Sequence, residues 1–186
     1  MKKTMVLLLY LFGGMLANVV VSFFIGELYP DRPQVPDIFF DTFPLWMWTQ
    51  YLSDPLLINS YIIFIFALRN EFSKPFIHLI LLSMAHIHYM RAAFIGMTPL
   101  GRYPDNLTTY GIFDVQQHGM FSSGHIAAAF LLFLLVPAEK MKLRATLFTF
   151  FLLQVLVLLL SRGHYGIDIA GGCMVAYIGF QMAKQK

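Results

Sequence analysis

Two short segments hold residue types that could carry acid–base or nucleophilic chemistry. The first, SRGHYGID, places His164 four residues before Asp168. On a helix this spacing lets the carboxylate accept a hydrogen bond from one imidazole nitrogen, which sets the tautomer and leaves the other nitrogen basic. Arg162, two residues upstream of His164, supplies a bidentate fork suited to phosphate oxygens. Taken alone, a His–Asp pair is also compatible with a structural role at a helix end.

The second segment, HGMFSSGHI, precedes an apolar stretch. Ser123 is a good N-cap, and the turn at Gly124 opens a helix whose first N–H groups and dipole favour an anion. His125 then lies in the first turn, directed at whatever binds there. The structural alternative is a capped helix whose histidine faces the lipid headgroups.

The composition places both segments in a membrane protein. Of 186 residues, 58% are hydrophobic and 12% are charged, and the mean hydropathy is +0.67. An ordinary soluble domain carries about twice that share of charge. The net charge of +3 is spread over short loops, which argues against disorder and against a nucleic-acid-binding face. Cys173 is the one cysteine, so an internal disulfide is excluded.

We expect a single all-α domain over residues 1–186 that crosses the membrane six times. A hydrocarbon core about 30 Å thick needs about 20 apolar residues per helix. The N-terminal run resembles a signal peptide, but it is longer than one and lacks a clear cleavage site, so we expect it to be retained as the first helix. The six predicted helices cover about 5–25, 45–68, 76–97, 124–136, 145–160 and 167–183.

Basic residues predict the orientation, because they favour the cytoplasmic side. The side with both termini carries Lys2, Lys3, Arg69, Lys74, Lys140, Lys142, Arg144, Lys184 and Lys186, whereas the other side carries only Arg32, Arg91, Arg102 and Arg162. Both termini are therefore predicted to be cytoplasmic. The histidines and acids of the two segments then lie at the non-cytoplasmic ends of helices, where ionisable residues are functional candidates.

Together the two segments resemble the type-2 phosphatidic acid phosphatase superfamily, and within it the sphingomyelin synthase branch. Ser123-Gly124-His125 is similar to the Ser-Gly-His-Thr motif of that branch, and residues 164–168 (HYGID) resemble its His-Tyr-Thr-x-Asp motif. Residues 91–100 resemble the outer end of its third helix, and the Pro- and Asp-rich residues 32–44 resemble its first outer loop. The resemblance covers most of the chain.

This resemblance implies an integral membrane enzyme that transfers a phospho-headgroup from a phospholipid to a lipid alcohol, either ceramide or diacylglycerol, through a phosphohistidine. His164, oriented by Asp168, is the implied nucleophile, and His125 is the implied acid toward the leaving alcohol and base toward the acceptor. No metal or cofactor is required. The implied phosphate-binding residues are Arg91, Arg162, Ser123 and Gly124.

The expected partners are membrane lipids, with a second copy of the chain left open as a further partner. An amine headgroup such as choline or ethanolamine favours nearby carboxylates, so Asp37 and Asp41 are predicted to contact the substrate, together with Tyr165. The default state of such loop carboxylates is solvation. Trp46 and Trp48 are expected to anchor the chain at the outer interface.

Other functions stay open at this point. If water is the acceptor, the chain is a lipid phosphatase or a C-type phospholipase. A zinc hydrolase using His118 and His125 lacks an acidic ligand at a recognisable spacing. A rhomboid-like protease needs Gly-x-Ser-Gly, and Phe121 stands two residues before Ser123. A small transporter or a structural membrane protein is the non-enzymatic alternative.

Overall fold

The computed structural model describes residues 2–101 and 121–185, and within these ranges it contains helices and no strand. The predicted all-α class is confirmed. In chain order the elements are α1 (Lys2–Leu28), α2 (Ile38–Thr42), the 3₁₀ turn η1 (Met47–Thr49), α3 (Gln50–Leu68), the 3₁₀ turn η2 (Arg69–Glu71), α4 (Lys74–Met97), α5 (Gly124–Leu135), α6 (Met141–Leu160) and α7 (Gly166–Lys184).

Five helical segments in the described part of the chain are long and apolar enough to cross a membrane. They are α1, the continuous stretch from η1 to η2, α4, α6 and α7. The chain is therefore an integral membrane protein. The fourth predicted helix, α5, has 12 residues and a length of about 18 Å, which is shorter than a hydrocarbon core.

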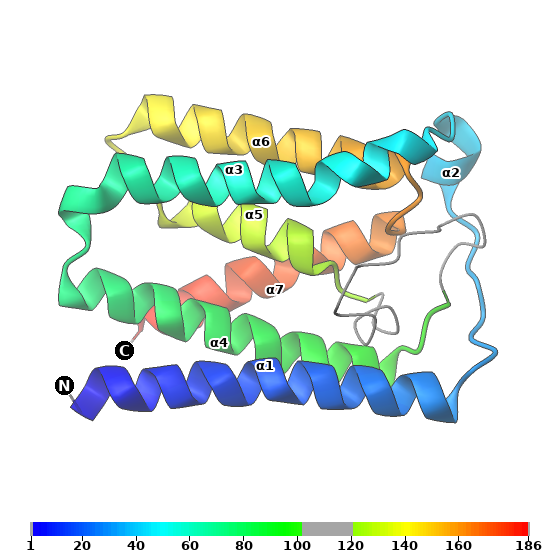
Figure 1. Cartoon of the computed structure of the whole chain (residues 1–186), viewed down its shortest axis with the longest axis horizontal. Helices are drawn as coiled ribbons and strands as arrows, with labels where there is room; N and C mark the ends of the chain where they lie inside the picture. The colour runs from blue at the N-terminus through cyan, green and yellow to red at the C-terminus, as the bar shows by residue number, and fades with distance from the viewer. Residues whose placement is uncertain (1, 102–120, 186) are drawn as a thin grey trace.

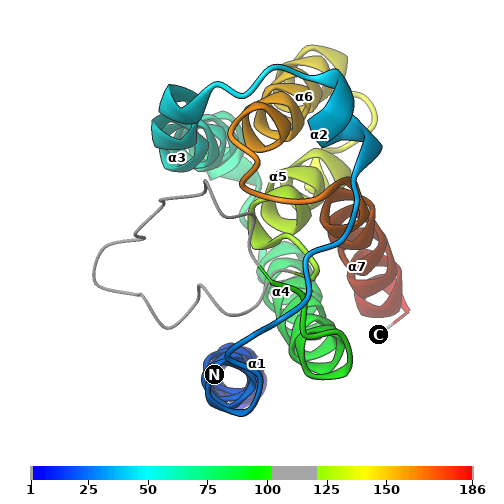
Figure 2. The same ribbon diagram turned by 90° about the vertical axis from the view of Figure 1, so that its right-hand side faces the viewer.

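The helices lie side by side and alternate in direction, so that both termini are at one end of the bundle (Figure 1). Seen from the other end, α5 lies in the middle of the bundle, with α3, α4, α6 and α7 around it (Figure 2). α1 lies at the periphery and packs along α4. The interior is built from fully buried small and branched side chains, among them Ala127 on α5 and Val175 and Ala176 on α7.

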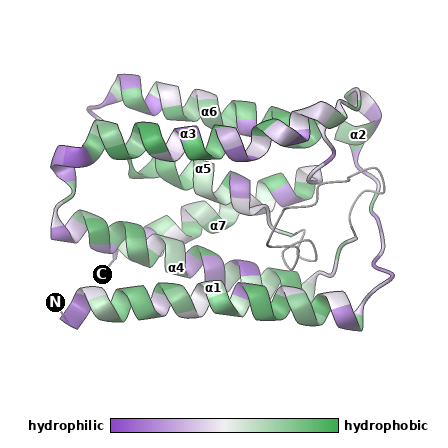
Figure 3. Ribbon diagram, in the orientation of Figure 1, coloured by the Kyte–Doolittle hydropathy of each residue, from purple (hydrophilic) through white to green (hydrophobic). Residues whose placement is uncertain are grey.

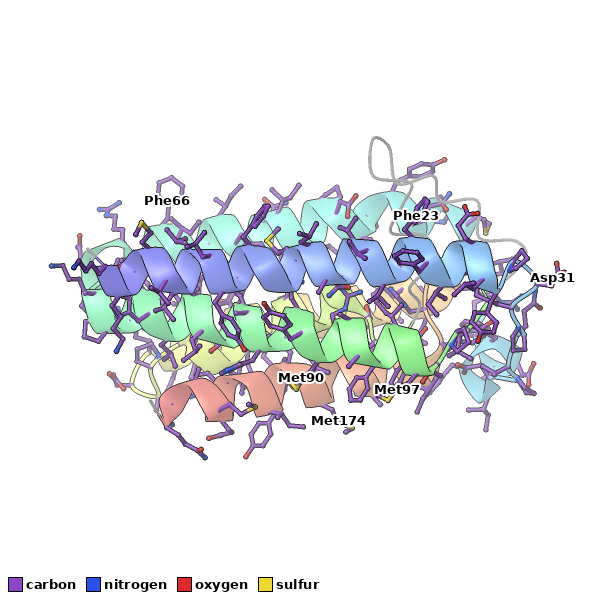
Figure 4. The ribbon with its side chains drawn as sticks, turned by 90° about the horizontal axis from the view of Figure 1, so that it is seen from below. Phe23, Asp31, Phe66, Met90, Met97 and Met174 are labelled. Carbon is purple, nitrogen blue, oxygen red and sulfur yellow. The ribbon has the colours of Figure 1, made fainter. Side chains whose placement is uncertain are left out.

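The helices are largely apolar along their length (Figure 3), and many of their large apolar side chains are exposed. Phe66, Met97 and Met174 are exposed and lie at the edge of the bundle, pointing away from it (Figure 4). Large apolar side chains can face outward when the surrounding solvent is lipid, because hydrocarbon does not penalise them. The exposed pattern therefore agrees with the membrane assignment.

Two histidines of α4, two residues apart, take part in contacts with neighbouring helices. His86 is buried, with Nδ1 3.4 Å from the carbonyl oxygen of Gly179 on α7. The carbonyl of His88 accepts a 2.7 Å hydrogen bond from Asn18 on α1. The ring of His86 also lies beside α1, with its centroid 5.9 Å from that of Tyr10, so both histidines line the contact between α1 and α4.

One short element was not predicted. Residues 32–44 read as a loop, yet Asp37 caps the five-residue helix α2, accepting a 2.9 Å hydrogen bond from the backbone N–H of Phe39. A helix of five residues is too short to show hydrophobic periodicity, so the N-cap residue was the one local signal for it.

Candidate active site

The two predicted segments meet at the end of the bundle opposite the termini, where α5 and α7 both begin (Figure 1). The backbone N–H of Ser123 donates a 3.0 Å hydrogen bond to the carbonyl oxygen of Asp168. Both residues are fully buried. The start of α5 is therefore joined directly to the first turn of α7, which places the Ser-Gly-His segment beside the His–Asp pair.

His164 and Asp168 form the predicted pair. His164 lies in the loop just before α7, and its Nδ1 is 3.2 Å from Oδ2 of Asp168. An ionised carboxylate can only accept a hydrogen bond, so Nδ1 carries the proton and Nε2 keeps its lone pair. If His164 acts as a nucleophile, as the sequence predicts, Nε2 is the nitrogen that this contact leaves available.

Asp168 also stabilises the start of α7. Its Oδ2 accepts a 3.0 Å hydrogen bond from the backbone N–H of Tyr165, the N-cap residue, which is one half of a capping box. Its carboxylate interacts electrostatically with the guanidinium of Arg91 on α4. A fully buried carboxylate needs such partners, because an unpaired charge is costly in a medium of low dielectric constant.

Arg91 reaches the start of α5 from α4. Its Nε donates a 2.8 Å hydrogen bond to the carbonyl oxygen of Ser122. Gly124 allows this approach, because a Cβ at position 124 would lie 3.0 Å from Nη1 of Arg91. Ser123 is the N-cap of α5, as predicted, and its Oγ accepts a hydrogen bond from the backbone N–H of Ile126. One cation therefore contacts the helix start and faces the buried carboxylate of α7.

Arg162 connects the loop before α7 to α2. Its Nη2 donates a 2.9 Å hydrogen bond to the carbonyl oxygen of Phe40, and its guanidinium lies 5.6 Å from the centroid of the Phe40 ring. Its φ of 52° is in the left-handed region, which an L-residue occupies at a cost of about 1–2 kcal/mol. This strained conformation is held by the contacts with Phe40, so at least part of the guanidinium has a structural role.

Asp37 likewise joins α2 to α7. Its Oδ2 accepts a hydrogen bond from the backbone N–H of Gly166, the first residue of α7, while its Oδ1 caps α2. A carboxylate at a helix N-terminus complements the positive end of the dipole. Tyr165 is buried, with its ring centroid 5.2 Å from that of Phe40, and Asp41 is exposed on α2. Substrate contacts by Asp37, Asp41 and Tyr165 stay predictions.

His125 has a partner that the sequence analysis missed. Its Nε2 is 2.7 Å from Oδ1 of Asp54, on the second turn of α3. The signal for Asp54 was present, because a carboxylate inside an otherwise apolar span is a functional candidate by default. His118, which entered the zinc alternative, lies outside the described residues.

The contact between α5 and α7 leads to a stability prediction. A Cβ at Gly172 would lie 2.8 Å from the backbone oxygen of Ser123 and 2.9 Å from Cβ of Ile126. We expect Gly172→Ala to lower the free energy of unfolding by about 1–3 kcal/mol, because the two helix backbones must separate. Gly96→Ala is the matched control, since its Cβ would meet only Cγ1 of Val21 at an ordinary 3.4 Å.

Thermal unfolding of both variants in detergent micelles, followed by intrinsic fluorescence, would test this expectation. A Gly172→Ala protein that unfolds at the wild-type temperature would show that the close approach of α5 and α7 is not needed.

Comparison with known protein families shows which family the chain belongs to. No curated protein matches it. The AtPDCT1/2 family model, which describes a phosphatidylcholine:diacylglycerol cholinephosphotransferase family, matches residues 59–185. The matched region includes α4 to α7 and with them His125, His164 and Asp168, whereas Asp54 precedes it. Because the match spans more than half of the 186 residues, this integral membrane protein belongs to the AtPDCT1/2 family of lipid headgroup transferases.

Proposed function

We propose that this protein transfers phosphocholine from a phosphatidylcholine-type lipid to diacylglycerol through a phosphohistidine on His164. The observation that carries the proposal is the hydrogen bond between His164 and the fully buried Asp168 in a chain of a cholinephosphotransferase family. The phosphohistidine mechanism is the one that the resemblance to the sphingomyelin synthase branch of the type-2 phosphatidic acid phosphatases implies.

In the first half-reaction, Nε2 of His164 attacks the phosphorus of the donor lipid. A P–N bond forms, and the bond between phosphorus and the glycerol oxygen breaks. His125, starting as imidazolium, gives its proton to the departing oxygen, so that neutral diacylglycerol leaves and phosphocholine stays on His164. Asp168 holds the Nδ1 proton throughout and stabilises the positive imidazole that forms.

The second half-reaction reverses the proton movements. Neutral His125 removes the proton from the hydroxyl of a second diacylglycerol, and that oxygen attacks phosphorus. The P–N bond breaks, a new phosphatidylcholine forms, and both histidines return to their starting states. Two histidines are needed because one is occupied covalently while the other moves the proton.

Negative charge builds up on the phosphoryl oxygens in both half-reactions. The guanidinium of Arg91 lies at the start of α5 and has further N–H groups besides the one that binds the carbonyl oxygen of Ser122. In this proposal those N–H groups stabilise the negative charge on the phosphoryl oxygens. The backbone at Ser123 and Gly124 adds the positive end of the α5 dipole. Arg162 is the weaker candidate, because its guanidinium contacts both the carbonyl oxygen and the ring of Phe40, whereas Arg91 binds the start of α5 itself.

The proposal includes six membrane crossings with both termini cytoplasmic and the site on the non-cytoplasmic face. α4 ends at the site end of the bundle and α6 begins at the opposite end, so the chain between them has to return, and α5 runs along that path (Figure 1). The distribution of basic residues supports the orientation. Cysteine-accessibility labelling of the loop between α1 and α3 in intact vesicles tests it.

A transfer assay separates the candidate functions. Purified protein in mixed micelles receives fluorescent diacylglycerol or fluorescent ceramide, together with phosphatidylcholine, phosphatidylethanolamine and phosphatidate. Fluorescent phosphatidylcholine is the expected product, and fluorescent sphingomyelin would make ceramide the acceptor. Free phosphocholine or free phosphate without a fluorescent phospholipid would mean that water is the acceptor. Absence of every product would overturn the enzymatic proposal.

His125→Ala is expected to lower kcat for transfer by about 10²- to 10⁴-fold, because both half-reactions lose their acid–base group. His88→Ala, which removes a histidine facing α1, is the matched control and should keep most of the activity. Steady-state transfer rates compared at equal amounts of folded protein check the expectation. If the two variants had similar rates, His125 would have no catalytic role.

A further inference from the structure

We propose that Asp54 is a positioning residue that orients His125 and sets its tautomer, which makes the α5 histidine the second carboxylate-oriented imidazole of the site. The inference rests on the proposed function. It identifies Asp54 as the partner of the acid–base histidine, His125. Asp54 precedes residues 59–185, the region that the family model matches.

The geometry defines which nitrogen of His125 exchanges protons. Nε2 of His125 is 2.7 Å from Oδ1 of Asp54. Because an ionised carboxylate only accepts, Nε2 carries a proton, and Nδ1 is the atom that donates to the leaving oxygen and later accepts from the acceptor hydroxyl. His164 has the opposite arrangement, with Nδ1 bound to its carboxylate and Nε2 reactive. The two imidazoles therefore react through different nitrogens.

The start of α3 is held firmly enough to act as a support. Ser53, next to Asp54, is buried and accepts a 2.8 Å hydrogen bond from Nε2 of Gln154 on α6. Oγ1 of Thr49 donates to the carbonyl oxygen of Trp46 at 2.7 Å and lies 3.3 Å from the carbonyl oxygen of Val157. The backbone N–H of Trp46 donates to the carbonyl oxygen of Leu160 at 2.8 Å. These three contacts pin residues 46–53 to the last turns of α6 and so set where Asp54 stands.

Stability alone does not account for this carboxylate. The Asp54 side chain is 60% exposed and that of His125 is 19% exposed. Exposed ion pairs contribute about 0–1 kcal/mol to stability, and a carboxylate on a membrane helix is itself costly. The buried Ser53–Gln154 contact already joins α3 to α6 without any charge. A role in orienting His125 explains why a carboxylate stands at this position.

The test compares Asp54→Asn and Asp54→Glu with wild-type protein in the diacylglycerol transfer assay. An asparagine amide can donate as well as accept, so it also supports the wrong tautomer of His125. General acid–base catalysis contributes about 10²- to 10⁴-fold, so a misoriented but present imidazole should lower kcat by about 10- to 100-fold with KM unchanged. Asp54→Glu keeps the carboxylate and should regain most of the rate.

Asp31→Asn is the matched control, because Asp31 is exposed at the tip of the site end and points away from the helices (Figure 4). Its kcat should equal that of wild-type protein. Thermal unfolding of all variants shows whether Asp54→Asn is folded. A purely structural role for Asp54 predicts a lower unfolding temperature without a selective loss of kcat, and without rescue by glutamate.

The outcomes separate this inference from the proposed function. If His125→Ala and His164→Ala are inactive while Asp54→Asn has wild-type kcat, the positioning role is wrong and the mechanism stands. If His125→Ala and His164→Ala both remain active, the mechanism itself fails. Loss of kcat in Asp54→Asn, unchanged KM and recovery in Asp54→Glu would establish the role.

Discussion

His164→Ala should abolish phosphocholine transfer, with a loss of at least about 10⁴-fold in kcat, because no other group in the proposed mechanism forms the covalent intermediate. The side chain precedes α7 and hydrogen-bonds Asp168, and its removal leaves the helix start capped by the bond between Asp168 and the Tyr165 N–H. The variant is therefore expected to insert and purify like wild-type protein.

The covalent intermediate gives this prediction a second readout. Wild-type protein incubated with choline-labelled phosphatidylcholine and no acceptor should retain label in a bond that acid cleaves, as expected for phosphorus on an imidazole nitrogen. His164→Ala should retain none. His78→Ala is the control, because His78 lies at the opposite end of α4, with Nε2 2.9 Å from Oγ1 of Thr4. Near-normal transfer by His164→Ala would rule out the phosphohistidine mechanism.

Asp168→Asn should lower kcat by about 10³- to 10⁴-fold, because an amide in place of the carboxylate supports the wrong tautomer of His164 and cannot stabilise its positive charge. The substitution also removes the negative charge that faces Arg91 in a buried site. The size of the amide preserves packing, and the cap on the Tyr165 N–H can still be made. We expect a stability loss of about 1 kcal/mol from the weakened cap, and a further loss because Arg91 no longer has the opposite charge of Asp168.

The measurement for Asp168→Asn is kcat and the unfolding temperature on the same preparation. A large loss of kcat in protein that is still folded at the assay temperature supports the orienting role. Equal losses of folded protein and of activity would instead mean that Asp168 acts only as the cap of α7. Asp37→Asn provides the comparison for the unfolding temperature alone, because Asp37 also accepts a hydrogen bond at the start of α7, from Gly166.

The sequence was sufficient to predict the membrane class, the helical fold and the pairing of His164 with Asp168. Each of these depends on local properties: the length of apolar runs, the positions of the punctuating loops and a spacing of four residues. The predicted helix limits agree with the observed ones to within a few residues, apart from the second helix, where α3 starts at Gln50 after the 3₁₀ turn η1. The N-cap at Ser123 is likewise a local signal.

What the tertiary structure alone decided is how distant segments share the site. His125 meets Asp54 across 71 residues, Arg162 meets Phe40 across 122, and Gly166 meets Asp37 across 129. No periodicity or spacing encodes such pairs, because they depend on which helix faces pack together and at what depth. The sequence therefore determined which residues could react, whereas the packing of α3 and α2 against α5, α6 and α7 decided which carboxylate contacts which histidine and which backbone carbonyl each arginine binds.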